Sequence, residues 1–325
     1  GDSEPVSLSN RPLPDGWQVV DLSLIEPSLA GSYDQSKEFY HVTGPTYSLA
    51  AFAVTNGQQV AIVFRGTDEP IDVIVDLLTA IASVDNYASQ FSNFVAAAIQ
   101  FASGRELFVA GHSLGGAIAE AFYSDNPGFF AGGLGIGSPP PDVLPAPKDQ
   151  NFLHVTRLQD TIGNFNSGAH TGISVFIDDR TFPSFPPDFG GPAHDHDRYY
   201  SQLDRIANSA VTAGLNFFDG IKFLFVDQNG PAVVGAAEML QYNAAFGNDW
   251  DDTFSGDFAN LTLRIDGGNG SDNISGGSAK DYLAGGAGHD DIRGNEDYDD
   301  IRGEAGMDSL YGGTGNDAIF GGAND

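Results

Sequence analysis

The sequence of 325 residues contains no cysteine, which excludes a disulfide framework and a thiolate metal site. Basic residues are scarce: 14 lysines and arginines stand against 44 acidic residues, for a formal net charge of −30. Such a chain repels nucleic acid phosphates, so we expect no nucleic acid partner. No apolar run reaches the roughly 18 residues that a membrane-spanning helix needs, and the first ten residues lack the features of a signal peptide. We therefore expect a soluble protein, exported, if at all, by another route or through a segment already removed.

The composition changes near residue 246. Residues 1–246 alternate apolar strand-like runs with helical patterns, whereas residues 247–325 hold 17 acidic and 4 basic residues and are rich in glycine. We therefore expect two domains, a catalytic-sized one over 1–246 and a smaller one over 247–325.

The first domain has the pattern of an α/β fold. Two strands are expected around the Asn56-Gly57 pair, which suits a tight hairpin turn. A mostly helical stretch over 71–101 precedes a strand at 107–110, a helix at about 114–123, and further strands at GGLGIGS and FLHVTRL. This alternation predicts a largely parallel sheet covered on both faces by helices.

The second domain repeats with a period of nine residues. Six segments in phase, from GGNGSDNIS to GGTGNDAIF, share a first-position glycine, a sixth-position aspartate and an eighth-position aliphatic residue. The glycines are Gly267, Gly276, Gly285, Gly294, Gly303 and Gly312, and the aspartates are Asp272, Asp281, Asp290, Asp299, Asp308 and Asp317.

This repeat predicts a coil of short parallel strands that binds calcium. One aliphatic side chain per repeat builds a thin core, while glycine turns and aspartates bring carbonyl and carboxylate oxygens together. Such hard oxygens suit Ca²⁺, and without the ion the stacked carboxylates repel one another, so we expect folding to require calcium. A flexible acidic linker is the alternative, but six repeats in phase argue against it.

Residues 267–325 resemble the repeats-in-toxin family. The resemblance implies a parallel β-roll with Ca²⁺ between turns and export by a type I secretion apparatus, hence a secreted, extracellular protein. Ala279, Asn295, Asp297 and Glu304 replace glycines of the pattern, so we expect distorted or empty ion sites around the middle repeats. The segment GNDWDDTFSG looks like a capping turn, and the last repeat is incomplete, which suggests truncation.

A candidate nucleophile lies in the segment LFVAGHSLGGAIAEAF, where GHSLG matches G-x-S-x-G around Ser113. In this motif the serine sits on a sharp strand-to-helix turn. The two glycines of the motif are needed because larger side chains would collide there. The alternative is a serine that caps an ordinary helix. The chain order Ser, Asp, His requires an acid after a later strand and a histidine beyond it, and Asp160 with His194 or His196 meets it.

Residues from about 35 to 205 resemble the class 3, or fungal-type, lipases of the α/β-hydrolase fold. Five landmarks carry the resemblance in order: FRGT at 64–67, GHSLGG at 111–116, GSP at 137–139, DTI at 160–162 for the family's D-P-V, and HDRY at 196–199. It implies Ser113 as nucleophile, His196 as general base and Asp160 as orienting acid. Thr67 and Leu114 would supply the oxyanion-hole N–H groups.

Two points stay open within this hypothesis. His194 and, less favoured, His170 are alternative bases, although only His196 has the spacing to Tyr199 that the family shows. The apolar run IDVIVDLLTAIASV at 71–84 is either a core helix or a lid, and TFPSFPPDFGGPA at 181–193 is a second candidate lid or acyl-chain wall.

The sequence therefore predicts a secreted, calcium-dependent serine carboxylic ester hydrolase, with a triacylglycerol lipase as the leading reading. Phospholipase A1 and short-chain or polyester esterase are alternatives, and a calcium-dependent surface or adhesion protein is the non-enzymatic one. We expect an ester substrate, transient contact with a lipid interface, and a monomer.

Overall fold

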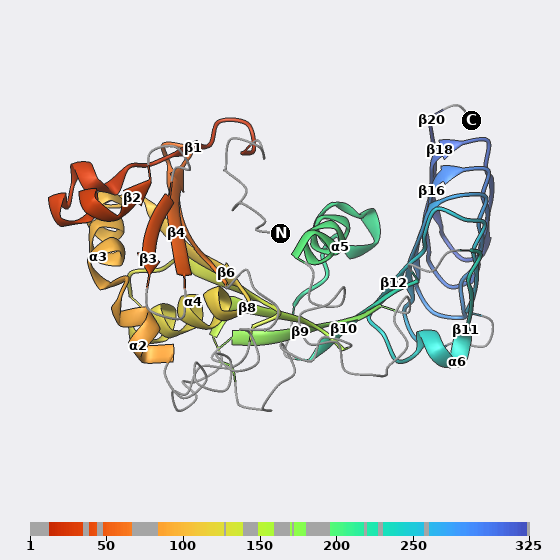
Figure 1. Cartoon of the computed structure of the whole chain (residues 1–325). Coiled ribbons are helices and arrows are strands. Elements are labelled where there is room, and N and C mark those ends of the chain that lie inside the picture. The colour runs from red at the N-terminus through yellow and green to blue at the C-terminus, as the bar shows by residue number, and fades with distance from the viewer. Residues whose placement is uncertain are drawn as a thin grey trace. The chain divides into compact units, whose positions relative to one another are not determined.

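The computed structural model describes residues 13–34, 39–43, 48–66, 84–126, 128–138, 149–158, 170, 172–179, 196–217, 220–226, 230–256 and 260–323. The side chains of residues 43, 48, 149, 150, 196 and 197 lie outside this description. The chain forms two compact units (Figure 1). Unit 1 comprises residues 1–174 and 187–196, and unit 2 comprises residues 175–186 and 197–325.

Unit 1 is built on a mixed sheet. Its strands are β1 (Gln18–Val19), β2 (Tyr33–Asp34), β3 (Phe39–Thr43), β4 (Ser48–Thr55), β5 (Gln59–Arg65), β6 (Glu106–His112), β7 (Gly132–Ile136) and β8 (Asp149–Arg157). They lie in the order β2-β3-β4-β5-β6-β7-β8, with β1 beside β4. Pairing is antiparallel up to β5 and parallel from β5 to β8, so the expectation of parallel strands holds for this second half.

The hairpin between β4 and β5 turns at the expected pair. Thr55 pairs with Val60, and Gly57 takes a φ of 90°, a left-handed conformation that glycine adopts without strain. The Asn56 Oδ1 accepts the backbone N–H groups of Gln58 and Gln59 at 3.0 and 2.8 Å, which closes the turn.

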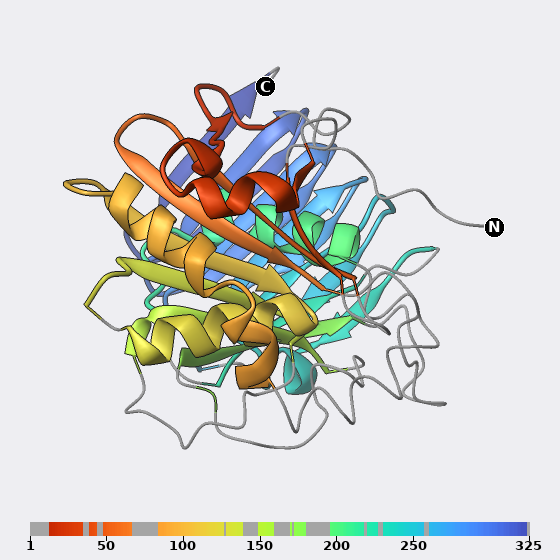
Figure 2. The ribbon, with the colours of Figure 1, turned by 60° about the vertical axis from the view of Figure 1, so that its left-hand side comes forward.

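Helices α2 (Val84–Ser89), α3 (Ser92–Phe101) and α4 (Leu114–Asp125) complete unit 1, with the short 3₁₀ turns Leu22–Leu24 and Pro27–Ser32. Helix α4 packs on β6 and β7 (Figure 2). In the core, the ring of Phe64 stacks on Phe122 with centroids 5.5 Å apart and meets Phe91 edge-on at 5.1 Å. The expected helical stretch 71–101 is thus confirmed from residue 84 onward, and residues 71–83 lie outside the described part.

Unit 2 holds the repeats and the elements that precede them. These are most of β9 (Gly172–Asp179), α5 (His196–Asn208) from residue 197, a 3₁₀ turn (Ala210–Thr212), β10 (Ile221–Phe225), β11 (Val233–Gly235), α6 (Ala236–Met239), β12 (Ala244–Phe246) and β13 (Thr253–Ser255). The repeats form β14 (Arg264–Asn269), β15 (Asn273–Ser275), β16 (Tyr282–Gly288), β17 (Asp291–Glu296), β18 (Asp300–Gly306), β19 (Ser309–Thr314) and β20 (Ala318–Ala323).

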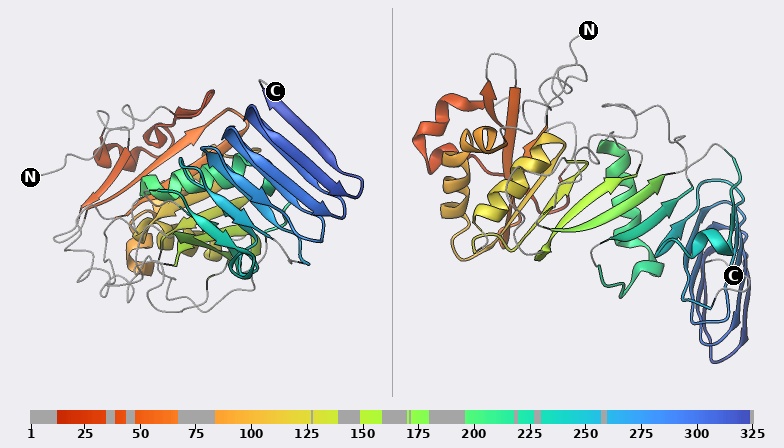
Figure 3. Two further views of the ribbon diagram at one scale, coloured as in Figure 1. Left: turned by 90° about the vertical axis from the view of Figure 1, so that its right-hand side faces the viewer. Right: turned by 90° about the horizontal axis from the view of Figure 1, so that it is seen from below.

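The repeats coil into two facing parallel stacks, seen as successive turns in Figure 3. One stack runs β12-β14-β16-β18-β20 and the other β11-β13-β15-β17-β19, and paired residues within the repeats are two nonapeptides apart. Four of the six eighth-position residues face inward and are buried: Ile274, Leu283, Ile292 and Ile301 are at most 1% exposed. Leu310 is partly buried, and Ile319, in the last complete repeat, is 46% exposed. This confirms the α/β fold class followed by a parallel β-roll.

The composition change after residue 246 falls inside unit 2. Strand β12 ends there and pairs with β10 on one side and β14 on the other, so the first repeat strand continues a sheet that begins before the repeats. The boundary between a domain 1–246 and a domain 247–325 stays a prediction. Among the described helices, none has the length and apolar character needed to cross a membrane.

Candidate functional site

The parallel strands of unit 1 end at one edge of the sheet, and Ser113 lies at this edge. Strands β5, β6 and β8 run in the same direction, and their carboxyl ends are Arg65, His112 and Arg157. Carboxyl ends of parallel strands lie at a common edge, which is where ligands bind in α/β sheets. Ser113 directly follows one of these ends. Thr67 and Asp160 come two and three residues after the other two in the sequence and lie outside the described residues.

Ser113 occupies a strained turn between β6 and α4. Its backbone has φ 56° and ψ −132°, outside the regions that residues with a Cβ prefer. It is the N-terminal cap residue of α4, but its side chain makes no capping hydrogen bond to the helix, and the residue is 4% exposed. The alternative of an ordinary helix-capping serine does not fit this geometry, whereas the strained strand-turn-helix serine of hydrolases does.

Two glycines of the GHSLGG segment allow close backbone contact around Ser113. A Cβ on Gly111 would lie 2.2 Å from the carbonyl oxygen of Gly115, and a Cβ on Gly115 would lie 2.2 Å from that of Phe64. Both distances are far below van der Waals contact. Alanine at either position would therefore have to move backbone.

The chain leaving β5 passes directly beside the serine. A Cβ on Gly66 would lie 2.9 Å from the Cβ of Ser113 and 2.8 Å from the carbonyl oxygen of His112. Gly66 precedes Thr67, which lies outside the described residues. Leu114 is the first residue of α4, so no intrahelical bond uses its N–H, and the helix N-terminus favours negative charge nearby.

The remaining predicted catalytic residues stay predictions. Asp160 and His194 lie outside the described residues, as do both candidate lid segments except Val84. His196 begins α5, and only its backbone is described. Further along α5, Arg198 and Gln202 bind the buried carboxylate of Asp179 at 3.0 and 2.9 Å, which anchors the helix to the end of β9.

A buried polar cluster that the sequence did not predict is centred on Glu120, on the helix that follows Ser113. Glu120, fully buried on α4, meets the Nδ1 of His170 with its Oε2 at 2.7 Å. The ring of His170 stacks on that of His154 with centroids 3.3 Å apart, and the Nε2 of His154 lies 2.9 Å from the carbonyl oxygen of Ser138. The only sequence signal was a lone glutamate inside an apolar helix segment. Because His170 is engaged with Glu120, seven residues or about 10 Å of helix from Ser113, it fits the base role poorly.

In unit 2 the repeat aspartates share one structural contact. The Oδ1 of each accepts a backbone N–H from the preceding coil, at 2.7–3.1 Å. In one series the N–H groups of Asp252, Asp272 and Asp290 bind the Oδ1 atoms of Asp272, Asp290 and Asp308. In the other, the N–H groups of Leu263, Asp281 and Asp299 bind the Oδ1 atoms of Asp281, Asp299 and Asp317. The Oδ2 of each lies over the first glycine of its own repeat, where a Cβ would come within 2.1–2.4 Å of it. Glycine is therefore required at these positions.

The carboxylates are disposed for a cation. The Oδ2 atoms of Asp272, Asp290 and Asp299 are buried without a hydrogen-bond partner, a costly state for a charged group in the absence of a bound ion. Burial raises the pKa of Asp272 to about 7 and that of Asp281 to about 6. Within the described residues, no three His, Asp or Glu side chains converge as a metal site, so backbone carbonyls must complete any coordination shell.

Three of the replaced glycine positions keep a left-handed backbone. Asn295 and Glu304, at the second position of their repeats, have φ values of 84° and 75°, against 103° and 105° for the equivalent Gly286 and Gly313. Asp297, at the fourth position, has a φ of 72°, whereas the glycines at that position in other repeats range from 113° to 153°. Asparagine and aspartate tolerate this conformation, and glutamate does so at a cost of about 1–2 kcal/mol. The turns therefore keep their course at these substitutions.

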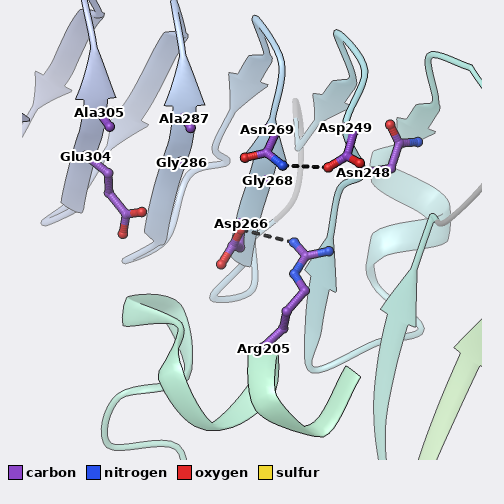
Figure 4. A pocket seen from close by; sticks show the side chains of 10 residues that line it. All are labelled: Arg205, Asn248, Asp249, Asp266, Gly268, Asn269, Gly286, Ala287, Glu304 and Ala305. Carbon is purple, nitrogen blue, oxygen red and sulfur yellow. Dashed lines mark hydrogen bonds and ion pairs between the residues drawn. The ribbon is translucent and has the colours of Figure 1, made fainter. Parts of the chain in front are cut away.

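A polar cavity of about 350 Å³ lies in unit 2 against β14, β16 and β18 (Figure 4). Arg205 reaches from α5 to Asp266 at 3.3 Å and to the carbonyl oxygen of Gly247 at 2.6 Å, and Asn269 binds Asp249. The lining contains carboxylates and amides but no serine, threonine or histidine. It therefore contains neither a serine nucleophile nor a histidine base.

Comparison with known proteins identifies the repeats. The family model described as RTX calcium-binding nonapeptide repeat matches residues 266–301 and 294–325, so this part of the chain consists of calcium-binding repeats. No curated protein sequence matches the chain.

Several solved lipase structures are similar to the chain. Lip2 lipase from Yarrowia lipolytica is 19% identical, with a TM-score of 0.35 over 50% of this chain and 66% of that chain, just under two thirds of its length. The lipase from Rhizopus microsporus var. chinensis is 14% identical, with a TM-score of 0.33 over 55% of this chain and 80% of that chain. The Rhizomucor miehei lipase in its propeptide complex is 16% identical, with a TM-score of 0.33 over 53% and 79%.

Proposed function

We propose that the protein is a secreted, calcium-dependent serine carboxylic ester hydrolase. The observation that carries the proposal is Ser113, held in a strained turn at φ 56° between a parallel strand and a helix, without a capping role. The order of Thr67, Ser113 and Asp160 after the carboxyl ends of β5, β6 and β8 supports it. An inert domain would have no need to keep this strain.

The reaction proceeds through an acyl-enzyme. The Ser113 hydroxyl oxygen attacks the ester carbonyl carbon while His196 takes the hydroxyl proton, and Asp160 orients the imidazole and stabilises its cation. The N–H groups of Thr67 and Leu114 bind the oxyanion, and loss of one such donor costs about 10²- to 10³-fold in rate. His196 then protonates the departing alcohol, and water activated by the same histidine hydrolyses the acyl-enzyme.

Within this class we propose lipid esters, with triacylglycerol as the leading substrate. The resemblance of residues 35–205 to class 3 lipases supports this choice. Phospholipase A1, and short-chain or polyester esterase, are the alternatives. The calcium-binding repeats support export by a type I secretion apparatus, followed by folding where calcium is plentiful.

The decisive experiment is active-site labelling with a fluorophosphonate in calcium. We expect one adduct on Ser113, none on Ser113→Ala, and a melting temperature for the variant within about 2 °C of the parent. Labelling that persists in Ser113→Ala, or ester hydrolysis unchanged in it, would refute the proposal. If no ester is hydrolysed and no adduct forms on the folded, calcium-loaded chain, the adhesion-protein alternative stands instead.

Two comparisons refine the outcome. His196→Ala should abolish labelling while His194→Ala preserves it, and the reverse result would reassign the base. A panel of triacylglycerol emulsion, phosphatidylcholine vesicles, a soluble short-chain ester and a polyester film then separates the substrate classes.

A further inference from the structure

Five aspartates of the roll, Asp252, Asp272, Asp281, Asp290 and Asp299, divide into two groups by the partner of one oxygen. Their Oδ1 atoms all accept a backbone N–H from the preceding coil, including Asp252 in the capping turn, whose Oδ1 takes the N–H of Ala232 at 2.6 Å. Oδ1 therefore performs the same structural task at each turn, and only Oδ2 can distinguish one aspartate from another.

In the first group, Oδ2 has an amide partner within its own turn. The Oδ2 of Asp252 accepts the N–H of Asn248 at 2.8 Å, and that of Asp281 accepts the N–H of Gly277 at 2.7 Å. Both oxygens of each carboxylate are therefore hydrogen-bonded by the chain itself.

In the second group, Oδ2 has no such partner. Asp272, Asp290 and Asp299 are 2%, 2% and 0% exposed, and their Oδ2 atoms make no hydrogen bond within the described residues. A buried carboxylate oxygen without a partner is strongly unfavourable when charged, so a bound cation would stabilise the ionised form at these positions.

The division follows position in the roll. Following the Oδ1 contacts, Asp252 is the first aspartate of the series 252, 272, 290, 308, and Asp281 is the first of the series 281, 299, 317. Each series thus begins with an aspartate satisfied by backbone amides. An amide N–H directed at Oδ2 also presents positive charge where a cation would have to approach.

We propose that Asp252 and Asp281 are capping residues and not calcium ligands, and that calcium binds through the aspartates that follow them in each series, Asp272 and Asp290 in the first and Asp299 in the second. The roll then has a base that folds without the ion, onto which the calcium-dependent turns are added. This proposal concerns the repeats alone and does not depend on the role of Ser113.

Matched Asp→Asn variants of the full chain test this division. Calcium binding, measured by titration calorimetry, should lose at least one equivalent or weaken at least 10-fold in Asp290→Asn and Asp299→Asn. In Asp281→Asn, stoichiometry and affinity should stay within about 2-fold of the parent. Loss of calcium in Asp281→Asn equal to that in Asp290→Asn would overturn the proposal, as would unchanged calcium binding in Asp290→Asn.

Melting temperatures in chelator give an independent and opposite readout. Asparagine at 281 or 252 replaces an oxygen acceptor by an NH₂ donor and should lower the melting temperature. At 272 or 290 it removes a buried, unpartnered charge and should leave the melting temperature unchanged or raise it. The opposite order of the two pairs would contradict the assignment.

Hydrogen exchange of the unmodified chain covers the case in which Asp252→Asn does not fold. In chelator, peptides from 244–256 should keep at least 10-fold slower exchange than peptides from 300–323, and calcium should slow exchange mainly in the latter. Equal loss of protection over both regions would show that the roll has no calcium-independent base.

Discussion

Replacing Gly115 by alanine sets two opposing effects against each other at the turn that carries Ser113. Gly115 lies in the first turn of α4, and alanine is a better helix former than glycine by about 1 kcal/mol. By propensity alone, the substitution would stabilise the protein. Packing predicts the opposite, because the new Cβ would lie 2.2 Å from the carbonyl oxygen of Phe64 and 2.8 Å from the carbonyl carbon of Arg65.

Moving the contacted atoms would cost considerable free energy. They are backbone atoms of β5, which pairs with β4 on one side and β6 on the other. Ordinary contact needs more than 1 Å of additional separation, and overpacking of this kind costs about 3 kcal/mol. The net destabilisation is then about 2 kcal/mol, which corresponds to a fall of about 4–8 °C in the melting temperature of a unit of this size.

Calorimetry of Gly115→Ala in saturating calcium measures this value. Gly128→Ala is the matched control, because a Cβ there meets nothing within 4 Å, and it should change the free energy of unfolding by less than about 0.5 kcal/mol. The variant should also label more slowly with fluorophosphonate, since the displaced strand leads to Gly66 beside Ser113. A melting temperature of Gly115→Ala equal to or above that of the parent would refute the packing argument.

Three further measurements test the repeats and the buried cluster. Chelation should lower the melting temperature of unit 2 by at least about 10 °C, because one site contributes about 4 kcal/mol when free calcium is at 1,000 times its Kd. An unchanged melting transition would contradict the role of calcium. In chelator, unit 2 should lose stability as pH rises from about 4 to 7. The pKa of Asp272 is raised to about 7 in the folded form, so the folded form binds more protons than the unfolded form in this pH range. Asp272→Asn should flatten that slope, and a slope of the opposite sign is the refuting result. Glu120→Gln should lower the free energy of unfolding by about 1–3 kcal/mol, because it weakens the buried hydrogen bond to His170. At the exposed Glu106, the control Glu106→Gln should lower it by less than about 0.5 kcal/mol. Equal effects would show that the buried pair contributes nothing.

Local patterns predicted the elements wherever one physical rule dominated. The Asn56-Gly57 hairpin, the strand before Ser113 and the helix after it follow from turn chemistry and apolar periodicity. The β-roll follows from a nine-residue period that places Ile274 beside Ile292 in one stack and Leu283 beside Ile301 in the other, all four buried. Beyond the predicted hairpin of β4 and β5, the antiparallel strands β1, β2 and β3 were not anticipated, because the partner of a strand is decided by pairing in the folded chain.

The candidate site divides in the same way. The sequence indicated Ser113 and the glycines around it, but the contact between Gly115 and Phe64 joins residues 51 positions apart, so only the fold could display it. The cluster of Glu120, His154 and His170 was missed for the same reason: the sequence marks a single glutamate in an apolar segment, and the histidines reach it only through the sheet.

The sequence by itself determined which residue types stand at each turn, and hence a parallel roll that binds calcium and a serine suited to a nucleophile's turn. The tertiary structure decided what each of those residues meets. Repeated aspartates are identical in sequence pattern, yet the Oδ2 of Asp281 accepts an amide and that of Asp290 does not. The physical reason is that the role of a carboxylate depends on the groups that surround it. Those groups come from other turns and other strands, and the folded backbone decides which of them reach it.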